Sequence, residues 1–97
     1  MENMETGLTR VVRVVNKRGL HARAAARFVT LAERFEAEIE VSRDGQSVSA
    51  RSIMGLMLLG AGQGTEISLS GPASGRDAAA AIAALAGLVE AGFNEQD

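Results

Sequence analysis

Apolar residues recur along the chain at two spacings, one typical of strands and one typical of helices. β-branched residues are concentrated between Thr9 and Val15, which predicts a first strand. A turn sequence follows at 16–19. Between 25 and 32 apolar residues then recur at the i, i+3, i+4, i+7 spacing, which predicts an amphipathic helix over 22–34.

The middle of the chain predicts a hairpin and a short helix. Apolar and polar residues alternate over 37–41, Asp44-Gly45 interrupts them, and the alternation resumes over 48–50. The apolar run 53–59 predicts a short helix, for which Ser52 is a suitable N-cap.

Glycine and proline bound the elements of the second half. A strand is predicted over 65–70 and a helix over 76–91. The predicted boundary residues are Gly60 or Gly62 after the short helix, Gly71-Pro72 after the strand, Ser74 or Asp77 as the cap of the last helix, and Gly92 at its end.

The predicted order of elements is βαββαβα, with apolar residues mostly on one face of each strand and in one stripe of each long helix. Burying both sets requires two layers. We therefore expect an α+β fold, an open-faced two-layer sandwich in which a four-stranded antiparallel sheet carries three helices on one face. The domain is expected over 8–92, between a disordered N-terminal leader at 1–7 and a C-terminal tail at 93–97.

Composition and charge exclude several classes of function. The three aromatic side chains are all phenylalanine and the net charge is −2, so base-stacking platforms and a basic field for nucleic acid are both missing. With no cysteine and one histidine, no metal site or cofactor is expected. The acidic N-terminus precedes no long apolar run, so we expect no secretion signal, no membrane insertion and a cytoplasmic location.

The single histidine, His21, falls just before the first predicted helix. Helix N-termini carry free N–H groups and partial positive charge, which disfavour an imidazolium and favour an anion. His21 should therefore stay neutral and nucleophilic near pH 7, and Arg23 adds a guanidinium that can bind phosphate oxygens. Local spacing leaves open that His21 only caps the helix or lies exposed. Hydrolase chemistry is disfavoured because the motif lacks a cysteine or serine partner.

Two motifs carry a resemblance to a known family. They are Gly19-Leu20-His21-Ala22-Arg23 and, later in the chain, Arg51-Ser52-Ile53-Met54-Gly55-Leu56-Met57. In this order they resemble HPr, the histidine phosphocarrier of the phosphoenolpyruvate-dependent phosphotransferase system, over residues 9–92. The resemblance implies an HPr-like sandwich, phosphorylation of His21 on Nδ1 by enzyme I, and delivery of the phosphoryl group to A-type domains of enzyme II. It also implies that Arg23 stabilises the phosphate.

One position departs from the family pattern. The family usually has proline directly after the arginine, and this chain has Ala24. Proline lacks an N–H, so alanine adds a donor to the phosphate-facing helix end formed by Ala22 and Ala24. Alanine here, together with Asn16-Lys17-Arg18, resembles alphaproteobacterial members of the family.

Ser52 has two compatible roles. As an N-cap it would stabilise the short helix by about 1 kcal/mol. Its surroundings also resemble those of the regulatory serine in family members that are substrates of HPr kinase/phosphorylase, and a helix N-terminus tolerates a phosphate.

The short helix carries more apolar side chains than a helix of its length can bury against the sheet. If Leu56 and Leu59 face the sheet, the methionines point outward, and flexible methionines suit a surface that fits several partners. The alternative is that they complete a small core. The predicted partner surface consists of Ile53, Met54 and Met57, with Arg27 and Arg51 around it.

Three classes of function follow from these observations. The favoured one is a phosphocarrier, which is not itself an enzyme; the others are a non-catalytic regulatory binding module with His21 incidental, and a small enzyme. The active-site motif is shared by the sugar and nitrogen-related branches, and Ser52 with Asn16-Lys17-Arg18 favours the regulatory branch. A monomer is expected.

Overall fold

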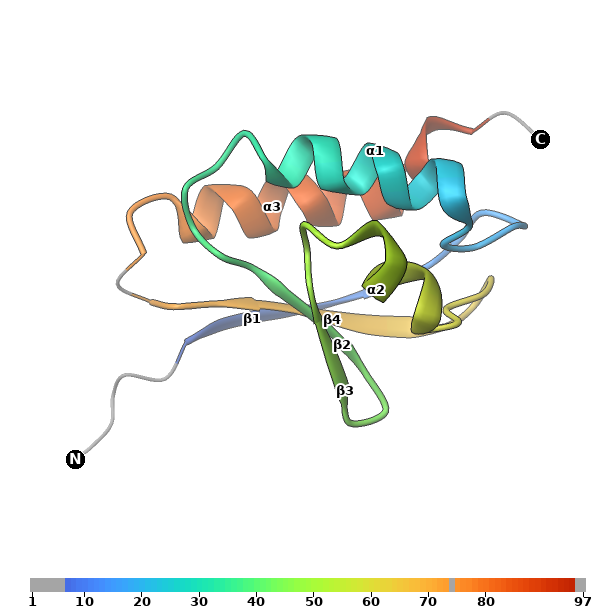
Figure 1. The fold of residues 1–97 in the computed structure, drawn as a ribbon, viewed down its shortest axis with the longest axis horizontal. Helices are drawn as coiled ribbons and strands as arrows, with labels where there is room; N and C mark the ends of the chain where they lie inside the picture. Colours follow the sequence, from blue (N-terminus) through green and yellow to red (C-terminus); the bar gives the residue numbers. More distant parts are fainter. Residues whose placement is uncertain (1–6, 74, 96–97) are drawn as a thin grey trace.

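The computed structural model of the chain describes residues 7–73 and 75–95. Its strands form one sheet, above which α1 and α3 lie side by side, with α2 shorter and nearer the sheet (Figure 1). The elements are β1 Leu8–Arg13, α1 Ala22–Ala32, β2 Glu40–Arg43, β3 Gln46–Ser49, α2 Ile53–Leu58, β4 Glu66–Gly71, α3 Ala78–Glu90 and the 3-10 helix η1 Gly92–Asn94.

The four strands are arranged in the order β1-β4-β2-β3, and every neighbouring pair is antiparallel. The last strand therefore lies between the first two strands of the chain, which the α1 connection keeps apart. Val12 of β1 is opposite Ile67 of β4, and Leu69 of β4 is opposite Val41 of β2. The predicted sandwich and its element order are confirmed.

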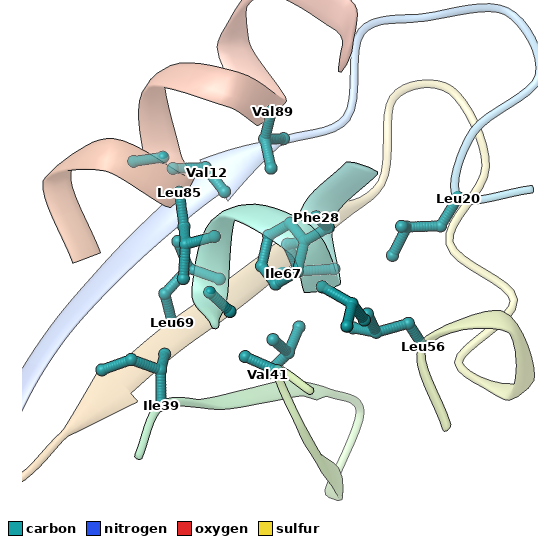
Figure 2. Close-up of a cluster of buried hydrophobic side chains, with 14 of the residues drawn as sticks. Val12, Leu20, Phe28, Ile39, Val41, Leu56, Ile67, Leu69, Leu85 and Val89 are labelled. Atoms are coloured by element: carbon teal, nitrogen blue, oxygen red, sulfur yellow. The ribbon is translucent and has the colours of Figure 1, made fainter. Parts of the chain in front are cut away.

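The core lies between the sheet and the helices. Alternate strand residues point to the same face of the sheet. The side chains on the covered face are at most 3% exposed; they are Val12, Val41, Ile67 and Leu69. Figure 2 shows them meeting Phe28 of α1 and other side chains from the helices. Each such side chain contributes roughly 1.5–3 kcal/mol on burial. This layer fixes α1, whose first residues build the site described below.

Helix and strand ends differ by a few residues from those predicted, as is usual for element boundaries. The helices α1 and α3 end at Ala32 and Glu90. The strand β1 ends at Arg13 although Val14 N–H still donates to the carbonyl of Thr65 at 2.8 Å, because the carbonyl of Val14 accepts from Gly64 N–H, at 2.7 Å, and not from Thr65. Among the helices in the part of the chain described here, none has the length and apolar character needed to cross a membrane.

Asp77 occupies the N-cap position of α3 but does not cap it with its side chain. Its carboxylate instead accepts the backbone N–H groups of Glu36 and Ala37, each at 2.8 Å. These two bonds are the main reason that the pKa of Asp77 lies below its ordinary value of 3.8. The capping role predicted for Asp77 is therefore wrong, and the other candidate, Ser74, lies outside the described residues.

The chain beyond α3 packs on the domain. Phe93 is fully buried although the predicted tail begins there, and η1 contacts both α1 and α3. Left-handed backbone at Phe93 and Asn94, with φ of 57° and 61°, turns the chain back toward α1. Residues 1–6 of the predicted leader and residues 96–97 of the predicted tail lie outside the part of the chain that the structure describes.

Candidate functional site

His21 is the N-cap residue of α1. Its backbone is extended, with φ −75° and ψ 178°, and its Nδ1 accepts the backbone N–H of Arg23 at 3.2 Å. The first helical bond is Ala25 N–H to the carbonyl of His21, at 2.8 Å. The amides of residues 22–24 thus have no carbonyl partner within the helix, and that of Arg23 bonds to Nδ1; a helix end of this kind attracts negative charge. The Nδ1 atom faces the part of the helix that suits an anion.

A tight turn and a second loop hold His21 in place. Gly19 N–H donates to the carbonyl of Asn16 at 3.2 Å, and Leu20 N–H donates to that of Ala61 at 3.0 Å. Gly19 has φ +65°, and a Cβ there would meet the Ala61 oxygen and lie 2.8 Å from Cα of Gly62. Glycine is required at this position both by the left-handed backbone and by the close approach of the loop.

The other ring nitrogen, Nε2, contacts a carboxylate that we did not predict. It hydrogen-bonds to Glu95 Oε2, while Glu95 Oε1 accepts from Asn16 Nδ2 at 3.0 Å. The same Asn16 nitrogen donates to the carbonyl of Gly19 at 2.9 Å. The hydrogen bond from His21 is the main reason that the pKa of Glu95 is lowered from its ordinary value of 4.5. No local sequence signal marks this residue, because it is brought to the site by the chain reversal after α3.

The remaining residues of the first motif have distinct placements. The side chains of Ala22 and Arg23 are exposed, so the Arg23 guanidinium is accessible next to the helix end. The methyl group of Ala24 is fully buried. Only its backbone amide can contribute to the helix end next to His21, because its side chain is buried in the core.

The two arginines predicted to surround the partner surface make contacts elsewhere. Arg27 Nη1 donates to the carbonyl of Phe93 at 2.6 Å, which ties α1 to the C-terminal segment. Arg51 Nη2 donates to the carbonyl of Phe35 at 2.6 Å, in the connection that follows α1. Both guanidinium groups therefore link backbone segments: Arg51 directly precedes Ser52 at the start of α2, and Arg27, on α1, reaches the C-terminal segment.

Ser52 and the outer face of α2 lie as the sequence predicted. Ser52 Oγ accepts the N–H of Gly55 at 2.9 Å, so Ser52 is the N-cap. Leu56 and Leu59 are buried, whereas Met54 is 70% exposed. The other exposed apolar side chains of this face are Ile53, Met57 and Leu58. The alternative that the methionines complete the core is wrong.

The chain is similar to known proteins over nearly its whole length. The family model described as the phosphorylation site of the PTS HPr component matches residues 8–91. The chain belongs to the HPr family. Phosphocarrier protein NPr of Shewanella violacea is 46% identical over 90 residues, covering 93% of this chain and 97% of that protein.

Solved structures of HPr proteins agree with this assignment. A crystal structure of HPr-C-His from Thermoanaerobacter tengcongensis has a TM-score of 0.85 at 43% identity, and the match covers 93% of this chain and 99% of that one. A structure described as an HPr dimer from the same organism has a TM-score of 0.70 at 42% identity, covering 98% and 100%. HPr is a phosphocarrier and not an enzyme, so the small-enzyme hypothesis is wrong.

Proposed function

We propose that Nδ1 of His21 accepts a phosphoryl group from phospho-enzyme I and passes it to an A-type domain of enzyme II. The observation that supports this most directly is the bond from Arg23 N–H to Nδ1. Only an unprotonated ring nitrogen can accept that bond, so Nδ1 carries the lone pair that a nucleophile needs. The lone pair lies where the helix favours a phosphate.

The proposed transfer requires no proton movement on the ring. The Nδ1 lone pair attacks phosphorus, and the N–P bond to His21 forms as the bond between phosphorus and the donor breaks, its electron pair staying with the donor. Arg23 N–H then donates to a phosphate oxygen instead of to Nδ1. The amides of Ala22 and Ala24 and the guanidinium of Arg23 supply the remaining donors in this proposal.

The exposed face of α2 is the proposed docking surface for both partners. Ile53, Met54 and Met57 present flexible apolar side chains to solvent, and α2 packs against α1, which carries the phosphate site. We keep Arg27 and Arg51 in the proposal as positive charge next to this surface, although backbone carbonyls already hold both guanidinium groups.

Regulation and branch are finer parts of the proposal. A partly exposed hydroxyl at a helix start makes Ser52 a candidate substrate for HPr kinase/phosphorylase. The NPr relative supports the nitrogen-related branch over sugar transport. We propose a cytoplasmic monomer, and sedimentation can distinguish this from the dimer described for one solved relative.

The function is tested by incubating the chain with phosphoenolpyruvate and enzyme I. We expect one acid-labile, base-stable phosphate on His21, none in His21→Ala, and slower transfer in Arg23→Ala, where the nucleophile is intact. Full labelling of a folded His21→Ala variant would refute the assignment. No labelling of the parent would leave the regulatory binding module, with His21 incidental, as the better hypothesis.

A further inference from the structure

The C-terminal segment is built onto the phosphorylation site through several independent contacts. Phe93 fills the core, and its carbonyl accepts from Arg27 at 2.6 Å. Glu95 N–H donates to the carbonyl of Gly92 at 3.1 Å, which closes the turn. The side chains of His21 and Glu95 are only 18% and 11% exposed, so their contact is largely shielded from water.

The two hydrogen bonds of the His21 ring select one tautomer. An ionised carboxylate accepts but does not donate, so Glu95 requires the proton of His21 on Nε2. The backbone N–H of Arg23 donates, so it requires a lone pair on Nδ1. Both requirements are met by the same neutral form of the ring.

We infer that Glu95 is a positioning residue for phosphoryl transfer, which holds His21 in the Nε2–H tautomer and stabilises the ring while Nδ1 carries phosphate. This rests on the proposed function. When the Nδ1–P bond forms and the donor's bond to phosphorus breaks, the proton stays on Nε2 and positive charge develops on the ring. A carboxylate on Nε2 opposes that charge directly, in the manner of carboxylates that orient histidines elsewhere.

Asn16 completes the arrangement as a support for Glu95. Its Nδ2 reaches both Glu95 Oε1 and the carbonyl of Gly19, so it links the carboxylate to the turn that carries His21. Asn16 is 6% exposed, which places this link in the interior. The pKa of Glu95 is lowered by the hydrogen bond from His21, by that from Asn16 and, less strongly, by the charge of Arg18, which agrees with an ionised carboxylate at neutral pH.

The test compares Glu95→Ala and Glu95→Gln with Glu90→Gln. Glutamine keeps an oxygen that can accept from Nε2 but removes the charge, whereas alanine removes both. Glu90 is exposed and pairs with Arg10 at 3.3 Å, so Glu90→Gln makes the same change of net charge on the surface. Melting temperatures of all three variants establish that they fold.

The decisive readout is the pair of ring ¹⁵N chemical shifts of His21, measured at pH 8, above the ordinary pKa of histidine. We expect a single Nε2–H tautomer in the parent, Glu95→Gln and Glu90→Gln, and a shift of both ¹⁵N signals toward a mixture in Glu95→Ala, where only the bond from Arg23 N–H still favours Nε2–H. Phosphorylation by enzyme I should slow by about tenfold or more in Glu95→Ala. It should slow less in Glu95→Gln and stay unchanged in Glu90→Gln.

Unchanged ring shifts and unchanged transfer in folded Glu95→Ala would overturn the inference. Its failure can be told from failure of the proposed function, because the ring shifts are measured without any phosphoryl donor. If the parent accepts no phosphate, the function is wrong whatever the tautomer; if the parent is phosphorylated and Glu95→Ala keeps its ring shifts and rate, only the role of Glu95 is wrong.

Discussion

Replacing Gly19 by alanine tests how the turn that carries His21 is held against its neighbouring loop. The new Cβ would meet two backbone atoms, the oxygen of Ala61 and Cα of Gly62, the second at 2.8 Å. Backbone cannot move aside as a flexible side chain can, so the turn and the loop must separate. The bond from Leu20 N–H to Ala61, 3.0 Å long, is then lost.

The chain offers a matched control in Gly60, which has the same φ of +65° as Gly19. A Cβ at Gly60 would lie 3.5 Å from Arg43 Nη1, an ordinary contact. Both substitutions carry the roughly 1–2 kcal/mol cost of a left-handed L-residue, partly offset by about 0.4–1 kcal/mol from a less flexible unfolded chain. Only Gly19→Ala also leaves the N–H of buried Leu20 without its partner, at about 1–3 kcal/mol.

Thermal unfolding of the two variants should therefore differ. The extra cost of about 2 kcal/mol predicts that Gly19→Ala melts roughly 10 °C below Gly60→Ala, at about 4–8 °C per kcal/mol for a domain of this size. Transfer to His21 should also slow in Gly19→Ala, because the ring moves with its turn. Equal melting temperatures for the two variants would refute the argument that the loop contact requires glycine.

Three further predictions concern residues away from this turn. Ser52→Ala should lower the free energy of unfolding by about 1 kcal/mol through loss of the α2 cap, and an unchanged urea midpoint would contradict it. Asp77→Asn should make the free energy of unfolding less dependent on pH in acid: the N–H groups of Glu36 and Ala37 lower the pKa of Asp77, so its contribution is present above its ordinary pKa of 3.8 and is lost as the pH falls below that value. If parent and variant lost the same free energy of unfolding as the pH is lowered, this prediction would be wrong. Met54→Asp should keep its melting temperature within about 3 °C of the parent, because exposed substitutions change stability little, yet bind enzyme I more weakly; normal binding would exclude Met54 from the docking surface.

The layers of the fold could be predicted because each element buries a side-chain pattern of its own period. Alternation in β2 and β4 and the 3.6-residue stripe of α1 leave one way to remove both sets of apolar groups from water, a sheet covered on one face. The same logic placed Leu56 and Leu59 inside and Met54 outside, because a helix as short as α2 cannot bury every side chain. Where an element packs one face against the core, the periodicity of its apolar residues is enough to predict which side chains are buried.

Contacts made by polar side chains across long sequence separations were harder to predict from the sequence. Asp77 has a suitable residue type at a suitable helix start, yet its carboxylate bonds to the amides at Glu36 and Ala37. Arg27 and Arg51 were predicted to lie around a partner surface, and each also donates to a backbone carbonyl that is distant in the sequence. Propensity describes what a polar group prefers locally, and the partner it obtains depends on which chain segment passes nearby.

The same distinction applies to the proposed phosphorylation site. The turn at 16–19, the histidine and the helix start are contiguous, so the sequence alone predicts a nucleophile facing an anion-binding helix end. Where the ring proton resides depends on what contacts Nε2, and that group arrives from residue 95 after α3 and the left-handed turn at Phe93. Phe93 falls four residues after Val89, at the spacing of the α3 stripe, but Gly92 ends the predicted helix before it, so the residues from 93 onward look like a tail. Burial of the Phe93 ring holds the C-terminal segment on the domain, and this places Glu95 next to His21. In this proposal the identity of the nucleophilic atom is a local property of the motif, whereas its protonation state depends on the folded chain.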